Sequence, residues 1–194
     1  MNPVDKIVAD RVSAKGFNDP IADVCFLALS DDNRPSARTL VMRNICEAGF
    51  TLFLNKTSEK WRILEANNRA ELLLWFSTLQ RQYRVRGIIE ELARESIENN
   101  WPRRPTGSKY LDHAYSHLQR QSRPIESHAL LAQQIQDFKQ ANPEESLTTP
   151  ETATGLKLNS EEIEMLDLSD PNQIHDRRLF RRDQCNWIAT QLMP

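Results

Sequence analysis

The stretch Arg38-Thr39-Leu40-Val41-Met42-Arg43 is the most informative part of this 194-residue chain. It places a largely apolar, strand-forming segment between two arginines. Side chains alternate between the two faces of a strand, so Arg38 and Arg43 point to opposite faces when the strand is regular. A bulge, a ligand lying along the strand or a second subunit is therefore needed to bring both cations to one site. The alternative is an ordinary barrel strand with two solvated ends.

Short apolar segments flank this stretch and are separated by turn-forming residues. They predict strands from Val24 to Ser30, Ser36 to Asn44, Phe50 to Asn55, Glu71 to Phe76 and Arg81 to Leu92. Between them, Ser58 can cap a helix that extends to about Asn67. Several strand pairs with one intervening helix favour a small β-barrel over a layered α/β sheet. The predicted fold class is therefore mainly β with helices, an α+β protein.

The second half of the sequence predicts helices first and strands again at its end. The expected helices run from Ser96 to Trp101, Tyr110 to Gln119 and Ser127 to Lys139, and the expected strands from Ile163 to Leu168, His175 to Arg181 and Trp187 to Leu192. Ala141 to Ser160 is rich in Pro and Thr and predicts a polar loop. We expect one domain over residues 1–194, with a barrel core at 20–92, a helical segment at 93–140, the loop at 141–160 and C-terminal strands at 161–194.

Composition excludes several classes of protein. The formal net charge is −2, whereas a general nucleic-acid or acidic-membrane binder carries a strong basic excess. Eighteen of the 25 basic residues are arginine, the side chain suited to bidentate phosphate or carboxylate recognition. Cys25, Cys46 and Cys185 form no C-x-x-C pattern, which predicts free thiols in a reducing compartment. Because the longest apolar run, Leu72 to Phe76, is far too short to span a membrane, we expect a cytoplasmic protein.

A second arginine-rich segment, Arg81-Gln82-Tyr83-Arg84-Val85-Arg86-Gly87, follows an apolar strand. Alternation puts Gln82, Arg84 and Arg86 on one face and the apolar residues on the other. A cationic strand face is commonly exposed to solvent. If it is buried, it requires anionic partners, because an unpaired buried charge is costly.

Asn55 to Lys60 runs from a strand end into a helix start. The free amides of a first helical turn, with Ser58 and Lys60, can hold a phosphate, although capping also explains the serine.

His113 and His117 have the i, i+4 spacing of zinc pairs. No glutamate follows His113 and no third ligand is evident apart from Asp112, so we expect no metal.

Several motifs match a known family in order and spacing. The most specific are Asn33-Arg34-Pro35-Ser36-Ala37-Arg38, Leu79-Gln80-Arg81-Gln82, Arg104-Pro105-x-x-Ser108, Gln121-Ser122, His175-Asp176-Arg177 and the closing Gln191-Leu192-Met193-Pro194. With them the chain resembles the pyridoxamine 5′-phosphate oxidase family, flavin mononucleotide (FMN) enzymes of the split-barrel fold. The resemblance runs from about Pro20 to the C-terminus.

The resemblance implies FMN as the cofactor and a homodimer with two flavin sites at the subunit interface. The residues that match the family's cofactor ligands are Arg38, Thr39, Leu40, Val41, Arg43, Phe53, Leu54, Asn55, Ser58, Lys60, Gln82, Gln121, Ser122 and Arg177. Of these, Arg38, Ser58 and Lys60 would hold the flavin phosphate. The implied substrate-binding residues are Arg43, Arg104, Ser108, Gln173 and His175. His175 and Arg43 would be the catalytic residues.

Other positions depart from the family pattern. Arg43 stands where the family has a lysine, Glu59 where it has an arginine and Phe53-Leu54 where it has a Tyr-Thr pair, while Asn100 replaces a tyrosine, Gln173 an arginine and Leu166 a tryptophan. Flavin-phosphate positions are mostly kept, whereas about half of the substrate positions are replaced. Because losing a bidentate arginine weakens anion binding, FMN binding is better supported than oxidation of pyridoxamine phosphate.

The expected function is thus an FMN-dependent oxidase resembling pyridoxamine/pyridoxine 5′-phosphate oxidase, an enzyme of pyridoxine biosynthesis. By analogy, a hydride would pass from the substrate carbon that bears the amine or hydroxyl to flavin N5, and oxygen would reoxidise the flavin. Two alternatives stay open: a flavin oxidoreductase for another small aromatic substrate, as in the phenazine-pathway branch, or an FMN-binding module without turnover. The expected partners are a small phosphorylated or aromatic substrate and a second copy of the chain, with neither nucleic acid nor membrane.

Overall fold

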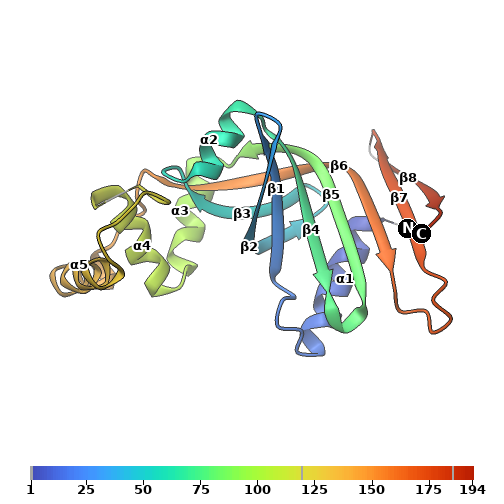
Figure 1. The fold of residues 1–194 in the computed structure, drawn as a ribbon, viewed down its shortest axis with the longest axis horizontal. Coiled ribbons are helices and arrows are strands. Elements are labelled where there is room, and N and C mark those ends of the chain that lie inside the picture. The colour runs from blue at the N-terminus through green and yellow to red at the C-terminus, as the bar shows by residue number, and fades with distance from the viewer. Residues whose placement is uncertain (1, 119, 185) are drawn as a thin grey trace. The chain divides into compact units, whose positions relative to one another are not determined.

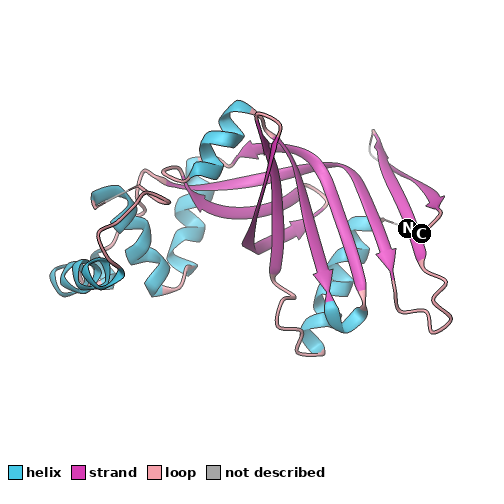
Figure 2. Ribbon diagram, in the orientation of Figure 1, coloured by secondary structure: helices cyan, strands magenta, loops and turns pink. Residues whose placement is uncertain are grey.

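The computed structural model describes residues 2–118, 120–184 and 186–194 (Figures 1 and 2). Gln119, the expected end of a helix, and Cys185, an expected free thiol, lie outside the described residues. The chain divides into two compact units. The barrel unit comprises Met1–Leu52, Ala66–Glu90 and Leu156–Pro194, and the helical unit comprises Phe53–Glu65 and Glu91–Gly155.

The strands of the described chain belong to one sheet. They are β1 (Val24–Asp31), β2 (Arg34–Cys46), β3 (Gly49–Asn55), β4 (Arg69–Phe76), β5 (Arg81–Glu91), β6 (Ala153–Asp167), β7 (Asp176–Asp183) and β8 (Asn186–Leu192). Their order is β3-β2-β1-β4-β5-β6-β7-β8, and an additional β3–β6 pairing closes the first six strands into a barrel. The β1–β2, β1–β4, β2–β3, β4–β5, β6–β7 and β7–β8 pairs are antiparallel. The predicted small barrel with helices is confirmed.

The described chain also contains α-helices and short 3-10 turns. They are α1 (Pro3–Gly16), α2 (Glu59–Ala66), α3 (Arg94–Asn100), α4 (Thr106–His117) and α5 (His128–Ala141), with 3-10 turns η1 (Ser77–Leu79), η2 (Trp101–Arg103) and η3 (Glu144–Ser146). In the barrel unit, α1 contacts β2, β4 and η1. In the helical unit, α4 packs against α5, and Ile97, Trp101 and Ala153 form a small core. Within the described residues, no helix is long and apolar enough to cross a membrane.

Alternating burial along β4 and β5 fills the barrel interior. On β4, Leu72 and Leu74 are buried, and on β5, Tyr83 and Val85 are buried. The residues between them on β5, Gln82, Arg84 and Arg86, are only half-buried. This period of two is what an antiparallel strand with one face on the core requires. The predicted assignment of the β5 side chains to two faces is confirmed.

Two glycines let β6 pass close to the backbone of neighbouring strands. A Cβ atom on Gly87 would lie 1.9 Å from the carbonyl oxygen of Asn159. A Cβ atom on Gly49 would lie 2.7 Å from the carbonyl oxygen of Leu158, and the φ angle of Gly49 is +138°. Both neighbours are backbone atoms of β6, which cannot rotate away. Closing the barrel therefore depends on glycine at these two positions.

A buried carboxylate attaches α1 to the barrel. Asp10 accepts hydrogen bonds from Lys6 Nζ (2.6 Å), from Arg81 Nη1 (2.8 and 2.9 Å) and from the Tyr83 hydroxyl. Arg81 also forms an ion pair with Asp167. Burial by itself raises the pKa of Asp10, but the hydrogen bonds from Lys6, Tyr83 and Arg81 outweigh it and hold that pKa below its ordinary value. Asp10 is thus the anion that neutralises a cation held against the core.

Two elements of the structure differ from those that the sequence predicted. The loop expected over Ala141 to Ser160 is shorter, because β6 begins at Ala153 and buries Leu156 and Leu158 among polar neighbours that conceal its alternation. Helix α1 was not predicted, although Asn2 accepts a hydrogen bond from Val4 N (2.9 Å) as its N-cap. The other predicted helices and strands are confirmed, mostly with bounds that differ by a few residues.

Replacing Gly87 by alanine tests the closure of the barrel. We expect Gly87→Ala to lower the free energy of unfolding by roughly 2–3 kcal/mol or more, since the new methyl group overlaps the backbone of β6. Gly16→Ala is the matched control, because nothing lies within 4 Å of a Cβ atom there. Urea denaturation of both variants measures the difference. Equal stability of the two variants would contradict the close approach.

Replacing Asp10 tests how α1 is attached. We expect Asp10→Asn to lower the free energy of unfolding at pH 7 by roughly 3 kcal/mol, because Arg81 and Tyr83 lose a buried anionic partner. The folded pKa of Asp10 is depressed, so its contribution is present above the unfolded pKa of about 3.9 and is lost as the pH falls below it. The gap between wild type and variant should therefore shrink below about pH 4. Asp5→Asn, at an exposed position of α1, is the control, and an equal effect there would refute this role.

Candidate functional site

A cavity of about 730 Å³ lies in the helical unit, where the chain leaves β3 and enters α2. Its lining combines four basic and two acidic side chains with hydroxyl and amide groups: Lys56, Thr57, Ser58, Glu59, Trp61, Arg62, Glu65, Arg120, Gln121, Ser122, Arg123, Pro124 and Thr152. Ser58, Gln121 and Ser122 are among the residues that the sequence predicted as cofactor ligands. A cavity with excess positive charge and several hydroxyl donors is suited to an anion.

Ser58 is the residue of this cavity whose side chain gives the strongest indication of a ligand. It is 4% exposed, and its hydroxyl has no hydrogen-bond partner among the described residues. Its backbone is engaged, since Ser58 N donates to Asn55 O (3.1 Å) and Trp61 N donates to Ser58 O (3.1 Å). The hydroxyl therefore does not cap α2, which was the alternative explanation from the sequence. A buried hydroxyl without a partner costs about 1–3 kcal/mol, which an external acceptor such as a phosphate oxygen would offset.

Hydrogen bonds hold the end of β3 to the segment that contains Gln121. Asn55 Oδ1 accepts from Thr57 N (2.9 Å) and from Thr57 Oγ1 (2.7 Å). Gln121 N donates to Thr57 Oγ1 (3.3 Å), and Lys60 Nζ donates to Gln121 Oε1 (3.4 Å). Asn55, Ser58, Lys60 and Gln121 are thus brought together, as expected for one binding site.

Not every predicted ligand of this unit presents its side chain to the cavity. Leu54 is 5% exposed and belongs to the core. Phe53 packs on Gly155, where a Cβ atom would lie 2.9 Å from the ring. The buried Leu54 can offer only backbone groups, whereas Phe53 is half-buried. Glu59, the charge reversal noted in the sequence, is exposed, so its repulsion of an anion is screened by solvent.

The predicted ligands of the barrel unit start with β2. Thr39, Val41 and Arg43 are exposed, with Val41 at 49%, while Arg38 and Leu40 are half-buried. The β2–β3 ladder shifts register between Met42 and Asn44. The ladder is therefore irregular at Arg43. This fits a bulge, which is one of the three ways of bringing both arginines of this strand to one site. Arg38 donates a hydrogen bond to the Ser36 hydroxyl.

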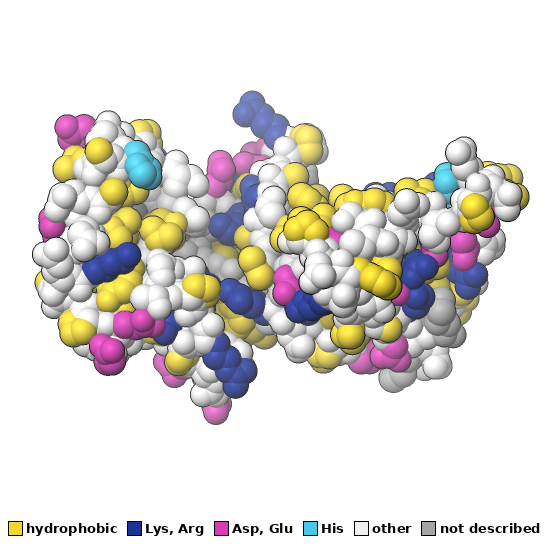
Figure 3. Space-filling model, turned by 90° about the horizontal axis from the view of Figure 1, so that it is seen from below, with side chains coloured by type: hydrophobic (Ala, Val, Ile, Leu, Met, Phe, Trp, Pro, Cys, Tyr) yellow, Lys and Arg dark blue, Asp and Glu magenta, His cyan; other side chains and the backbone are white. Residues whose placement is uncertain are grey.

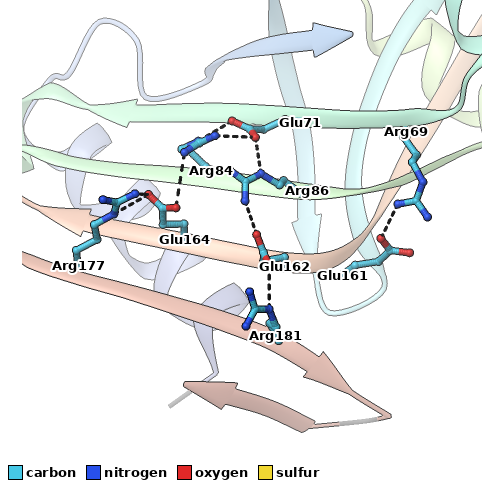
Figure 4. A network of polar contacts seen from close by, with 9 residues as sticks. All are labelled: Arg69, Glu71, Arg84, Arg86, Glu161, Glu162, Glu164, Arg177 and Arg181. Atoms are coloured by element: carbon cyan, nitrogen blue, oxygen red, sulfur yellow. Dashed lines mark hydrogen bonds and ion pairs between the residues drawn. The ribbon is translucent and has the colours of Figure 1, made fainter. Parts of the chain in front are cut away.

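Two arginines of β5, Arg84 and Arg86, are paired with glutamates on neighbouring strands (Figure 4). Arg84 Nε lies 2.7 Å from Glu71 Oε1, and Arg86 Nε lies 2.6 Å from Glu71 Oε2. Arg86 also bonds Glu162 on β6. Burial by itself raises the pKa of Glu71, but the hydrogen bonds and charges of Arg84 and Arg86 outweigh it and hold that pKa below its ordinary value. This strand face has the anionic partners that a buried cationic face requires.

Arg177, a predicted cofactor ligand on β7, belongs to the same network. Its Nε and Nη2 atoms each lie 3.1 Å from Glu164 Oε1. Glu164 is 6% exposed and also lies 3.6 Å from Arg84 Nη1 through its other oxygen. Figure 4 shows both arginines pointing at this one carboxylate. Sequence analysis missed Glu164, because nothing local marks a strand glutamate as the partner of residues on two other strands.

His175 and Gln173 lie in the segment before β7. The Nδ1 atom of His175 is buried and has no hydrogen-bond partner in the described part of the chain. Gln173 is exposed and has a φ angle of +60°. Gln82, on the half-buried face of β5, also belongs to the barrel unit. These positions remain predicted site residues.

Arg104 and Ser108, the predicted substrate ligands of the helical unit, lie at the start of α4. Arg104 Nε is 2.9 Å from Asp112 Oδ2, and Arg104 Nη2 donates to Asp112 Oδ1 (3.2 Å). Asp112 is 2% exposed and accepts a hydrogen bond from Trp101 Nε1 (3.0 Å). Burial raises the pKa of Asp112, and Arg104 and Trp101 oppose that rise. The sequence gave no reason to expect this pair.

The two histidines of α4 stack on each other with ring centroids 6.1 Å apart. His113 Nε2 contacts the carbonyl oxygen of Thr148 at 2.9 Å. Burial lowers the pKa of His113. Among the described residues, no group of three His, Cys, Asp or Glu side chains is placed to hold a metal ion. The pair packs against Phe138 of α5.

Comparison with known proteins assigns the chain to a family. The family model described as pyridoxamine 5′-phosphate oxidase matches residues 21–142. A pyridoxine/pyridoxamine 5′-phosphate oxidase of Acinetobacter baumannii is 32% identical over 100% of this chain and 88% of its own length. That of Rubrobacter xylanophilus is 32% identical over 92% of this chain and 80% of its own length. The chain therefore belongs to the pyridoxamine 5′-phosphate oxidase family.

Solved structures show the same fold. PhzG of Burkholderia lata 383, in complex with tetrahydrophenazine-1-carboxylic acid, has a TM-score of 0.89 at 23% identity and covers 100% of this chain and 93% of its own. A pyridoxamine 5′-phosphate oxidase-related, FMN-binding protein of Nostoc punctiforme has a TM-score of 0.80 at 18% identity, covering 100% of this chain and 99% of its own. At these identities the likeness concerns the fold.

Proposed function

We propose that this chain is an FMN-dependent oxidoreductase of the pyridoxamine 5′-phosphate oxidase type. The observation that carries the proposal is the buried, unpartnered Ser58 hydroxyl in a cavity with excess basic side chains. Membership of the family and the fold shared with an FMN-binding protein support it. The proposal includes a homodimer, which the resemblance in sequence implies, and a cytoplasmic setting, which the cysteine pattern and the short apolar runs of the sequence favour.

The residues of the cavity fit the phosphate of FMN. A phosphate needs cations and several donors. The cavity is lined by Ser58, Gln121 and Ser122 and by Arg62, Arg120 and Arg123. Lys60 bonds the side chain of Gln121. Lys56 is less suited, because its Nζ lies 2.7 Å from Glu91 Oε1. Hydrogen bonds among Asn55, Thr57 and Gln121 hold this donor set in place before a ligand arrives, which reduces the ordering cost of binding.

In the barrel unit, Arg38, Gln82 and Arg177 are further proposed FMN ligands, assigned from the sequence motifs. Arg177 is held in one orientation by Glu164, so its guanidinium is preorganised although its charge is partly balanced. Thr39, Val41 and Arg43 on the exposed face of β2 are proposed to lie along the cofactor.

The proposed reaction oxidises a small ring compound at the carbon that bears its amine, or its hydroxyl, and reduces O₂ to hydrogen peroxide. When bound, FMN supplies the two-electron chemistry of this step. His175 would hold the proton of the substrate amine at Nδ1, the buried nitrogen without a partner. Arg43 would contribute a positive charge near the reacting atoms.

A second candidate is a flavin oxidoreductase for another small aromatic substrate. The observation that favours it is the ion pair of Arg104, a predicted ligand of the substrate phosphate, with the buried Asp112. The fold shared with PhzG, solved with a phenazine compound, is consistent with such a substrate.

Titration of the purified protein with FMN tests the proposed cavity. We expect Ser58→Ala to weaken FMN binding about 10- to 100-fold, because a hydrogen bond to a charged group contributes roughly 1.5–3 kcal/mol. Ser13→Ala, at an exposed position of α1, should leave the affinity unchanged. Flavin fluorescence measures the dissociation constants. If the wild-type protein does not bind FMN, or if both variants bind alike, the proposed cofactor site is wrong.

Hydrogen peroxide release separates an oxidase from a binding module. The FMN-loaded protein should produce peroxide with at least one amine- or hydroxyl-bearing ring compound, beginning with pyridoxamine 5′-phosphate and pyridoxamine. We expect His175→Ala to reduce this turnover more than it reduces FMN affinity. Tight FMN binding with no turnover on either class of substrate would instead favour a module without catalysis.

A further inference from the structure

We propose that Asp112 abolishes phosphate recognition at Arg104, so that the substrate of this protein is a small ring compound without a phosphate ester. This inference rests on the proposed function and names the class of its substrate. It is carried by the contacts of Arg104, Asp112 and their neighbours in the helical unit.

The carboxylate of Asp112 lies against the guanidinium group of Arg104 and contacts two of its nitrogen atoms. Arg104 Nε and Nη2 lie 2.9 and 3.2 Å from the two carboxylate oxygens. The Nη2 contact is a hydrogen bond, whereas the buried Nε atom has no hydrogen-bond partner among the described residues and contributes to the ion pair through its charge. Trp101 Nε1 donates to Asp112 Oδ2 (3.0 Å) and fixes the carboxylate. The charge of Arg104 is therefore already balanced by a carboxylate of the protein.

Because the pair is buried, it strongly disfavours the binding of a phosphate at Arg104. The side chains of Arg104 and Asp112 are 17% and 3% exposed. A phosphate that approached Arg104 would meet a pair with no net charge and would be repelled by a carboxylate that solvent screens poorly. Displacing Asp112 is no solution, because a buried carboxylate without its cation is costly.

Neighbouring groups do not restore a phosphate site. Lys109 Nζ lies 2.7 Å from Glu144 Oε1 and is thus also paired. The amide of Asn100, which stands where the family has a tyrosine, donates to Ser96 O (2.8 Å). Arg103 is exposed, so its attraction for a phosphate is screened by solvent. The cations of this segment are neutralised or solvated.

The test compares phosphorylated and unphosphorylated probes on the FMN-saturated protein. Isothermal titration with pyridoxamine 5′-phosphate and pyridoxamine gives the preference for the phosphate group. We expect the wild-type protein to bind the two within about 3-fold of each other. We expect Asp112→Asn to bind pyridoxamine 5′-phosphate at least 10-fold more tightly than wild type, with little change for pyridoxamine, because a charged hydrogen-bond fork becomes available.

Two further variants secure the interpretation. Asparagine keeps the shape of Asp112 and an acceptor for Trp101, and unchanged FMN affinity verifies that Asp112→Asn is folded. The double variant Arg104→Gln/Asp112→Asn should lose the gain in phosphate binding. Asp137→Asn, which removes an exposed carboxylate from α5, should show no gain. A wild-type preference for the phosphate ester of 10-fold or more, or no gain in Asp112→Asn, would overturn the proposal.

Failure of the proposed function gives a different result. If the wild-type protein does not bind FMN, the proposed cofactor is wrong whatever the probes do. In that case, the effect of Asp112 on Arg104 is measured by the affinity of the FMN-free protein for inorganic phosphate. Asp112→Asn should still bind phosphate at least 10-fold more tightly than wild type, and equal binding would refute the role of Asp112.

Discussion

The backbone of β6 lies directly against Gly87 and Gly49, and the rest of the barrel depends on this close approach. It lets β6 pair within the sheet and close a barrel that would otherwise remain an open sheet with unpaired edges. With β6 in this position, Glu162 and Glu164 reach the arginines of β5, and β7 adds Arg177 beside them. The charged face in Figure 4 is thus a consequence of strand closure.

Arginine is abundant in this chain, yet many of its arginines are balanced by carboxylates of the same chain. Arg84 and Arg86 share Glu71, Arg177 bonds Glu164, and Arg104 bonds Asp112. Basic and acidic side chains are likewise interspersed on the face shown in Figure 3. In the cavity beside Ser58, basic side chains outnumber acidic ones. In our proposal, this contrast concentrates anion binding at the cavity and removes it from the segment of Arg104.

Local patterns in the sequence predicted the barrel and its strand faces, because alternation along β4 and β5 reports directly on burial. A local pattern also marked Ser58, and the family resemblance added Gln121; both line the cavity. The start of β6 was missed because polar residues surround Leu156 and Leu158. Glu164 and Asp112 were missed for a different reason. The partner of a buried arginine is set by tertiary packing between distant segments, which spacing along one chain does not encode.

A crystal structure of the protein with FMN tests the account most directly. The account predicts that the flavin phosphate lies in the cavity beside α2, with a phosphate oxygen about 3 Å from Ser58 Oγ, while Arg104 keeps its two contacts with Asp112. A phosphate bound away from Ser58, or an Arg104 that leaves Asp112 to contact an anionic ligand, would contradict it.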